Sequence, residues 1–420
     1  MRLRPVLHTP ARAAALAAAL VLVPLGVPAA TAAKGTPAPV ANPQDMWSVQ
    51  GAAAIRVLGK GYGHGHGMSQ YGAEGAARAG LTHQQIMEFY YPGTQWGTAT
   101  GKVRVHLTAD TTDDVVVVAK PGTTVKNLAT KKRWKLPNRT TGQWRLTTNR
   151  RNNKTIVQWR DRGSWKRWKA FSGDGELAAP GGLTLVTPSG RTTYRGKLRA
   201  ASPVPGSKQR DTVNVVSLEN YLKGVVPLEI PASWNPEAVR SQAVAARSYA
   251  AFERAQPLAR HYQICDTTAC QVYGGKSAEH PLATDAITAT AGQVLTADGA
   301  PAFTQFASSN GGWSSAGSRP YLAAQADPYD GWAGNPNHTW SVTMGVEKLE
   351  SAWPAVGSLQ TVTITARDGN GEWGGRVSRM TLTGTAGSVE VTGDQVRSAL
   401  GLKSSWFTLD VFQATLRGSW

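Results

Sequence analysis

Glycine and proline interrupt the chain so often that long uninterrupted helices are excluded over most of its length. The 420 residues include 45 Gly and 24 Pro, while 41% are hydrophobic and 17% are charged. This balance is typical of a globular chain with many turns rather than of a disordered chain or a long coiled coil. The length suffices for two or three domains with substantial cores, so folding needs no dense set of disulfides.

Short apolar runs bounded by turn residues predict a chain rich in strands. Between Lys102 and Arg210 the predicted strands are VRVHL, VVVVA, TIVQW and LTLVT. Further strands are predicted at 54–58, 212–216, 362–365, 377–382 and 389–391. The pair Asp298-Gly299 predicts a hairpin turn between strands at 294–296 and 303–306.

Helical signals cluster near the middle of the chain. One helix is predicted over about 218–226 and a second over about 236–255, with Asn235 as its N-cap and Pro236 at its first position. The chain as a whole is therefore expected to have a mixed α+β, strand-rich fold with a small helical cluster.

The first 33 residues have the features of a secretory signal peptide. Three arginines precede an apolar run at 13–25, and the small residues Ala30-Thr31-Ala32 follow it. The run has about 13 residues, whereas a helix that crosses a membrane needs roughly 20. We therefore expect a secreted protein without a transmembrane span, found outside the cell at the cell wall. Residues 34–50, with several Pro and Ala, are expected to form a linker.

Positive charge is concentrated in one segment of the chain. The formal net charge is +18, and residues 131–169 alone hold fourteen Lys or Arg and one acid, Asp161. Five tryptophans are interleaved with these cations: Trp134, Trp144, Trp159, Trp165 and Trp168. Indole faces stack on sugars or bases, and cations hold phosphates or carboxylates. Because export argues against nucleic acid, an anionic cell-wall polymer is the predicted partner; the alternative is a solvated hairpin anchored by its tryptophans.

Glu229 is the candidate catalytic residue. It follows the first predicted helix and has apolar neighbours, among them Val226, Leu228 and Ile230. Burial and the negative end of the helix both disfavour the charged carboxylate, so both are expected to raise its pKa. A carboxyl that stays protonated near neutral pH is what a general acid requires. The alternative is an ordinary, partly exposed glutamate at a helix end.

The run NYLKGVVPLEIP, followed by PEAVRSQAVAARSYA, resembles the core motif of the SpoIID/LytB family, the family of sporulation stage II protein D. Further blocks resemble the same family in the same order: CDTTACQVYGG at 265–275, FASSNGGWSS at 306–315, RPYL at 319–322 and RSALGLKSSWF at 397–407. The resemblance implies a catalytic core at 211–420, preceded by a β-rich segment at 97–210 that contains the basic insertion.

The resemblance implies a lytic transglycosylase that cuts peptidoglycan between N-acetylmuramic acid and N-acetylglucosamine, with Glu229 as its acid. One carboxyl then suffices, because the muramyl 6-hydroxyl replaces water, unlike two-carboxylate hydrolysis. Candidate substrate-binding residues are Gln242, Arg247, Tyr273, Ser308, Ser309, Gly311, Gly312, Tyr321 and His64. Core packing, turn geometry or an ion pair of Arg247 is the alternative for these positions. The rival function is a non-catalytic peptidoglycan-binding protein or amidase activator, as on the LytB side of the family.

Cys265 and Cys270 are the two cysteines of the chain. In an exported protein a disulfide is the expected state of such a pair. Some family members resemble a zinc site here, and His261 is the available third ligand. A fourth protein ligand is missing, so we expect a disulfide and no cofactor, with zinc at His261, Cys265 and Cys270 as the alternative.

A Gly- and His-rich element at 59–94 also resembles the family, in which it usually follows the LGLKS block. Here it precedes the other blocks, so the chain is expected to be circularly permuted, with this element beside the strand that follows Phe407. The element, within 51–96, is expected to pack on the core and to contain two short helices, the second opened by a Thr82/Gln85 capping box. Its two histidines, His64 and His66, are too few for a metal site and are expected to form a tight loop near the cleft.

Overall fold

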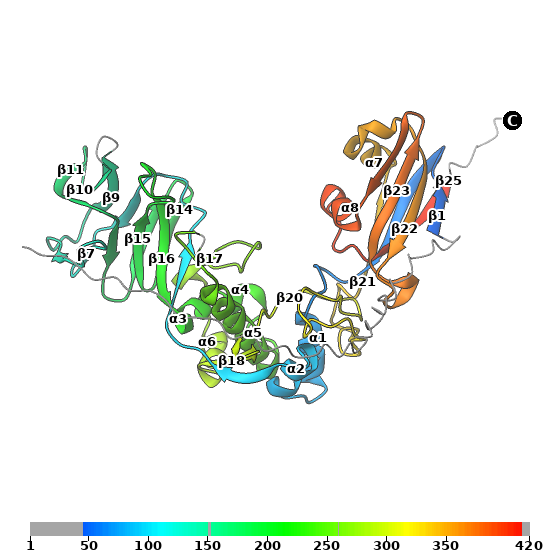
Figure 1. Ribbon diagram of the computed structural model, residues 1–420, viewed down its shortest axis with the longest axis horizontal. Coiled ribbons are helices and arrows are strands. Elements are labelled where there is room, and N and C mark those ends of the chain that lie inside the picture. Colours follow the sequence, from blue (N-terminus) through cyan, green and yellow to red (C-terminus); the bar gives the residue numbers. More distant parts are fainter. Residues whose placement is uncertain (1–44, 150–152, 259, 414–420) are drawn as a thin grey trace, which may run out of the picture. The chain divides into compact units, whose positions relative to one another are not determined.

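The computed structural model describes residues 45–149, 153–258 and 260–413. The predicted signal peptide and most of the predicted linker lie outside these residues. Within them, no helix combines the length and apolar character needed to cross a membrane. Strands and helices are mixed along the chain and strands predominate, which confirms the α+β prediction (Figure 1).

Two sheets, antiparallel except where β17 pairs parallel with β5, contain the β-rich segment that follows residue 101. One has six strands in the order β11-β10-β9-β6-β13-β14, and the other has seven in the order β17-β5-β16-β15-β12-β7-β8. Their bounds are β5 (Lys102–His106), β6 (Val115–Val118), β7 (Thr124–Asn127), β8 (Arg133–Lys135), β9 (Gln143–Asn149), β10 (Lys154–Arg160), β11 (Lys166–Ser172), β12 (Gly175–Ala178), β13 (Leu183–Thr187), β14 (Gly190–Tyr194), β15 (Lys197–Ala201), β16 (Asp211–Ser217) and β17 (Ile264–Cys265). The expected boundary at 210/211 falls between strands of one sheet, because β16 pairs with both β15 and β5.

The basic segment forms β8 to β11. Its tryptophans divide between core and surface: Trp144 is fully buried, whereas Trp134, Trp159 and Trp168 are partly buried against the core. Several cations lie over indole rings, with Arg139 3.3 Å from the centroid of Trp159 and Arg145 4.3 Å from that of Trp165. The exposed cations of the segment include Lys131, Lys132, Arg133, Lys135, Arg162, Lys166 and Arg167.

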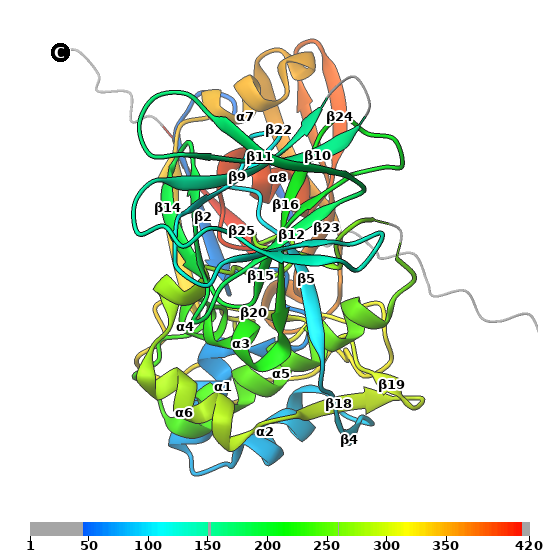
Figure 2. The ribbon, with the colours of Figure 1, turned by 90° about the vertical axis from the view of Figure 1, so that its left-hand side faces the viewer.

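The helices gather around α5 (Pro236–Ala255), which begins and ends as the sequence predicts and is capped by Asn235. It contacts α1 (Gln70–Arg78), α2 (His83–Tyr90), α3 (Leu218–Lys223) and α6 (Pro281–Ala289), as the grouping in Figure 2 shows. Close contact is possible because its packed face is made of alanines, including Ala243, Ala246 and Ala250, each fully buried. The predicted capping box of Thr82 and Gln85 opens α2.

The single helix predicted over 218–226 is wrong. The structure has two short helices, α3 and α4 (Val226–Glu229), separated at Gly224 and Val225. Pro227 is placed in the first turn of α4, where its missing N–H costs nothing. Gly224 lies against the ring of Tyr273, since a Cβ there would stand 2.7 Å from the ring. This break places Glu229 at the end of its own short helix.

A second core lies between two smaller sheets and two helices. One sheet has the order β1-β22-β23-β24 and the other β21-β2-β25. The bounds are β1 (Met46–Ser48), β2 (Ala52–Lys60), β21 (Thr339–Met344), α7 (Glu347–Ala352), β22 (Leu359–Arg367), β23 (Val377–Gly384), β24 (Gly387–Val391), α8 (Gly393–Leu400) and β25 (Phe407–Gln413). Since β1 pairs with β22, residues 46–48 belong to this sheet and not to the expected linker.

The N-terminal and C-terminal parts of the described chain meet at β2. This strand pairs antiparallel with β25, placing Gly59 opposite Phe407, as expected for the element beside the strand after Phe407. The element is divided between two cores, because β2 joins the second core whereas α1 and α2 pack with α5.

The remaining strands are short. The predicted hairpin at Asp298-Gly299 is present, since both residues have positive φ and join β18 (Gln293–Ala297) to β19 (Ala300–Pro301). β4 (Gln95–Thr98) pairs with the other edge of β18. The strand predicted at 303–306 is wrong: β20 (Phe306–Ala307) is instead a two-residue strand parallel to β3 (Met68–Ser69). Within the described ranges, tighter helical turns are also present at η2 (Gly275–Ala278), η3 (Pro354–Val356) and η4 (Glu372–Gly374).

Candidate active site

An open cleft of about 520 Å³ contains the side chain of Glu229. Its walls come from stretches that are far apart in the sequence: the Gly/His loop, α1, α4, α5, the loop after β17, β20 with its flanking residues, and α8. The lining residues are Tyr62, Gly63, His64, Gln70, Leu228, Glu229, Tyr249, Thr268, Ala269, Cys270, Val272, Gln305, Phe306, Ala307, Ser308 and Arg397. Tyr62 and Leu228 are nearly half exposed, at 46% each, and present apolar surface at this cleft.

Glu229 is held in a partly buried position by two neighbours. The backbone N–H of Val272 donates to its Oε1 over 2.9 Å, and the side-chain amide of Gln70 also donates to the carboxyl. Burial raises the pKa of Glu229, as the sequence predicts, while the two donated hydrogen bonds offset part of that rise because they favour the charged form. Burial thus raises the pKa of the carboxyl, while the Val272 N–H fixes its orientation.

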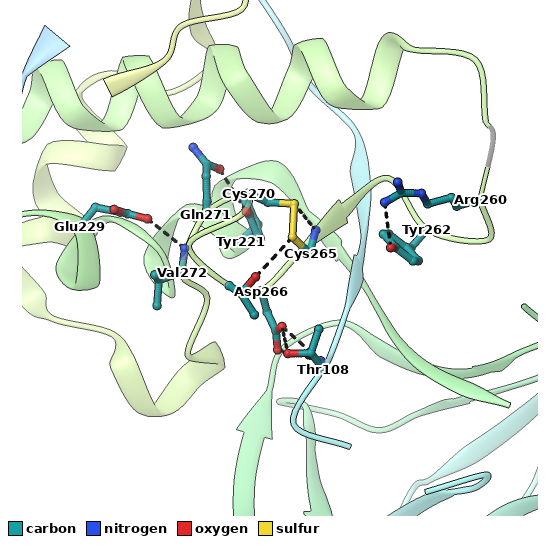
Figure 3. Close-up of a disulfide and its surroundings, with 11 residues drawn as sticks. Thr108, Tyr221, Glu229, Arg260, Tyr262, Cys265, Asp266, Cys270, Gln271 and Val272 are labelled. Carbon is teal, nitrogen blue, oxygen red and sulfur yellow. Dashed lines mark hydrogen bonds between the residues drawn. A yellow bond between two sulfur atoms is a disulfide. The ribbon is translucent and has the colours of Figure 1, made fainter. Parts of the chain in front are cut away.

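A disulfide-closed loop carries Val272 to Glu229 (Figure 3). Cys265 and Cys270 are joined by a disulfide, with Cα atoms 5.5 Å apart. The loop is fixed on one side by Asp266, whose carboxylate accepts from Thr108 Oγ1 over 2.7 Å. On the other side Gln271 accepts from the hydroxyl of Tyr221 over 3.1 Å. The loop thus forms one wall of the cleft and presents a backbone donor to the carboxyl.

The alternative zinc set does not come together. The two sulfurs are bonded to each other, and Nε2 of His261 lies 2.7 Å from the carboxylate of Asp211. Across the described ranges, no three His, Cys, Asp or Glu side chains are grouped so that they would hold a metal ion.

His64 lines the cleft as a neutral imidazole. Its Nδ1 accepts from the backbone N–H of His66 over 2.9 Å, so the proton is on Nε2. Burial, with the nearby charges of His66, Arg376 and Arg397, lowers the pKa of His64 to about 4. At neutral pH this side chain therefore adds a hydrogen-bond donor to the cleft wall and no charge.

Glycine is required where the His64 loop approaches β20. Gly63 and Gly67 both have positive φ, which disfavours a side chain. A Cβ at Gly63 would lie 2.7 Å from that of Ala307, and one at Gly67 would lie 2.1 Å from the carbonyl oxygen of Gln305. The alternation of glycine and histidine is thus explained by backbone contact rather than by phosphate or metal binding.

Of the residues predicted from the sequence, Glu229, His64 and Ser308 are brought together in the cleft. Ser308 is half-buried, and its Oγ accepts from the side-chain amide of Asn337 over 3.4 Å. The other candidates are absent from the lining and require a correction.

Gln242 and Arg247 are fully buried in α5 and support the site from behind. Gln242 accepts from Nε2 of Gln70 over 3.3 Å, so it orients a residue that itself touches Glu229. Arg247 forms a two-pronged ion pair with Glu219, both contacts at 2.9 Å, and donates to backbone carbonyls. The structure thus supports the alternative of an ion pair for Arg247, and not the predicted contact with substrate.

The candidates from later blocks form the layer beneath the cleft. Ser309 donates to the buried carboxylate of Asp330 over 2.9 Å, and the N–H of Gly311 donates to the same group over 3.1 Å. Gly312 packs against the ring of His338, and a Cβ at this position would lie 3.1 Å from that ring. The hydroxyl of Tyr273 donates to Asn214 over 2.8 Å, and that of Tyr321 accepts from a backbone N–H over 2.8 Å. We therefore revise their expected role from substrate contact to support of the walls.

The lining also includes residues that the sequence does not single out, among them Tyr62, Gln70 and Arg397. Each lies inside a block that resembles the family, GYGHGHGMSQYG for the first two and RSALGLKS for the third. The resemblance marks the blocks, but no local pattern indicates which of their polar residues turns toward a cleft formed by distant segments.

Comparison with known proteins gives consistent matches. Residues 206–296 match the family described as stage II sporulation protein. Over 136 residues the chain is 37% identical to the amidase enhancer of Bacillus subtilis, a match covering 31% of this chain and 18% of that protein. Over 248 residues it is 29% identical to stage II sporulation protein D of Bacillus subtilis, which covers 52% of this chain and 69% of the relative. The corresponding protein of Bacillus amyloliquefaciens is 28% identical over 222 residues, covering 47% and 61%.

Proposed function

Because the chain belongs to the SpoIID/LytB family, which supports a role at the cell wall, we propose that it is a secreted lytic transglycosylase of peptidoglycan. In this proposal it cleaves glycan strands between N-acetylmuramic acid and N-acetylglucosamine, and Glu229 is its single acid and base.

The arrangement around Glu229 suits a two-step proton transfer. The Val272 N–H holds Oε1, so the other carboxyl oxygen carries the proton to the departing glycosidic oxygen. The muramyl 6-hydroxyl then attacks the anomeric carbon, and the carboxylate takes up the hydroxyl proton. One carbon–oxygen bond breaks and one forms within the sugar, Glu229 recovers its proton, and no water is consumed.

One feature of the cleft favours this reaction over hydrolysis by two carboxylates. Among the described residues that line it, Glu229 is the sole Asp or Glu. Hydrolysis with inversion or retention uses a second carboxylate as base or nucleophile. Ring closure within the substrate needs no such group, so a lone carboxyl with a raised pKa is sufficient.

Product analysis of a Glu229→Gln variant tests the proposal. The wild-type protein is expected to release fragments with anhydro-muramyl ends from purified sacculi. Loss of the acid is expected to slow release by about 100-fold or more. Glu390→Gln is the matched control, because Glu390 lies on β24 and 61% of its side chain is exposed. Equal release by Glu229→Gln and wild type would contradict the assignment.

The similarity to an amidase enhancer favours a second candidate function, a non-catalytic one. An enhancer would speed the release of stem peptides by an added amidase while glycan strand lengths stay unchanged. The Glu229→Gln variant would then enhance the amidase as well as the wild type. The same sacculi, analysed for both glycan ends and freed peptides, distinguish the two functions.

We also propose that the basic segment at 131–169 binds an anionic cell-wall polymer. The cations named above are exposed on and beside β8 and β11, and others are stacked on indole rings. Since several indole faces are covered by these cations, recognition depends on charge more than on stacking with sugars. Charge of this density attracts a polyanion in a salt-dependent way.

A further inference from the structure

Arg397 places a positive charge in the cleft without a negative charge against it. It lies on α8, is half-buried and lines the same cleft as Glu229. Within the described ranges its guanidinium forms no ion pair and no hydrogen bond. The nearest acid on its own helix is the exposed Asp394, one turn earlier, at more than ion-pair distance. Arginine in a partly enclosed site is usually paired, so this one stands out.

Two further cations adjoin the same wall. Arg376 is almost fully buried against Gly65 and donates to the carbonyl of Gly63 over 3.2 Å. Lys403 stands 6.0 Å from the ring centroid of Tyr62, and its ammonium donates to the amide oxygen of Asn337 over 2.7 Å. Like charges held together repel one another, and such repulsion is relieved by a bound anion.

The charge of Arg397 acts on the pKa of neighbouring basic groups. Burial first, and the charge of Arg397 among further causes, lowers the pKa of Arg376 to about 10, with Asp368 acting in the opposite sense. Arg397 is also among the groups that keep His64 neutral. Among the described lining residues, Arg397 is the sole Lys or Arg.

We propose that Arg397 binds a carboxylate carried by the glycan whose glycosidic bond lies at Glu229. This inference rests on the proposed function. A guanidinium offers a carboxylate two parallel hydrogen bonds, which fixes orientation as well as charge. The exposed ring of Tyr62 provides a face on which the sugar that carries the carboxylate stacks. The carboxylate belongs either to the lactyl group of the sugar or to a peptide attached to it.

Calorimetric binding to the full-length Glu229→Gln protein, which leaves the probe uncut, tests the inference. The first probe is a tetrasaccharide of alternating N-acetylglucosamine and N-acetylmuramic acid with free lactyl carboxylates. The second carries a dipeptide on each lactyl group, which moves the carboxylate outward, and the third is the neutral N-acetylglucosamine tetramer. A probe with its carboxylate at Arg397 is expected to bind about tenfold more tightly than the neutral probe. The preferred carboxylate probe identifies the source of the carboxylate.

Adding Arg397→Gln is expected to remove this tenfold preference while leaving the neutral probe unaffected. Arg379→Gln is the matched loss of charge and is expected to keep the preference, because Arg379 is exposed on β23 and is not among the lining residues of the cleft. Arg397→Lys keeps the charge but not the two parallel hydrogen bonds, so it is expected to lose part of the preference. This variant also tests the inference if Arg397→Gln fails to fold.

Equal weakening of all probes by Arg397→Gln, or the absence of any preference, would overturn the inference. If the probes bind and the wild type cleaves, that result leaves the proposed function intact. Failure of every probe to bind, together with an inactive wild-type protein, would instead contradict both the inference about Arg397 and the proposed function.

Discussion

The protonation of Glu229 is set by an opposition between burial and two hydrogen-bond donors. Burial raises its pKa, and donation from Val272 and Gln70 lowers it. The sequence predicts the direction, because apolar neighbours surround the glutamate. It does not predict Gln70, which arrives from a helix about 160 positions earlier in the chain.

Removal of Gln70 therefore has a predictable sign. In Gln70→Leu the carboxylate loses a donor that favours its charged form, so the pKa of Glu229 rises further. A general acid is active while protonated, so the alkaline limb of kcat/KM is expected to move to higher pH. The pH profile on soluble glycan measures this, with Gln84→Leu at an exposed position of α2 as the control. A shift to lower pH would show that Gln70 stabilises the neutral form.

Arg247 stabilises the helices beneath the cleft and does not line the cleft. Arg247→Leu removes one partner of an ion pair whose guanidinium is fully buried, and is expected to lower the free energy of unfolding by about 3 kcal/mol. KM for soluble glycan is expected to stay unchanged where the variant is folded. Arg240→Leu, whose side chain is 36% exposed, is expected to cost about 1 kcal/mol or less. A stable Arg247→Leu variant with a raised KM for soluble glycan would instead indicate that Arg247 contacts the substrate.

At the scale of elements, a local signal decides where a helix starts, and distant packing decides where it breaks. The Asn235-Pro236 pair is a strong local start, and α5 follows it. No comparable cap separates α3 from α4; at the break, the ring of Tyr273 from some fifty positions later packs on Gly224. Glu229 ends α4 two residues before Pro231, so a local signal accompanies that end.

The disulfide loop couples stability to the site. The double variant Cys265→Ser/Cys270→Ser removes a short cross-link and is expected to lower the free energy of unfolding by about 2 kcal/mol. Because Val272 follows two residues after Cys270, the donor to Glu229 is held less firmly and kcat is expected to fall. Denaturant unfolding and cleavage assays check this, with reduction of the wild type as a parallel test. Unchanged kcat in the reduced protein would show that Asp266 and Gln271 suffice to hold the loop.

At the scale of the molecule, the sequence predicts the composition of the fold better than its division into parts. The pairing of β2 with β25 follows the expected reordering of the family's blocks. Strand pairing crosses the expected boundaries, because β16 pairs with β15 and β5 across residue 210, and β1 pairs with β22. Sheets pair segments that are distant in sequence, which no periodicity within one segment reveals.

Attachment and cleavage are expected to be separable activities of this molecule. Replacing Lys131, Lys132, Arg133, Lys166 and Arg167 with Gln should weaken retention on isolated walls and flatten its salt dependence, since fewer charges are screened. Cleavage of short soluble glycans should be unaffected. Lys276→Gln and Lys348→Gln, at exposed positions outside the segment, are the controls. Equal retention of all these proteins would contradict the role of the basic segment.

Digestion in heavy-oxygen water shows whether Glu229 cleaves the glycan without the participation of water. If Glu229 passes its proton to the leaving oxygen and the 6-hydroxyl closes the ring, the new muramyl ends are anhydro ends that contain no heavy oxygen. Mass spectrometry of the released fragments is expected to show these ends, and their loss in Glu229→Gln. New reducing ends that carry one heavy oxygen would contradict the account, because they require attack by water.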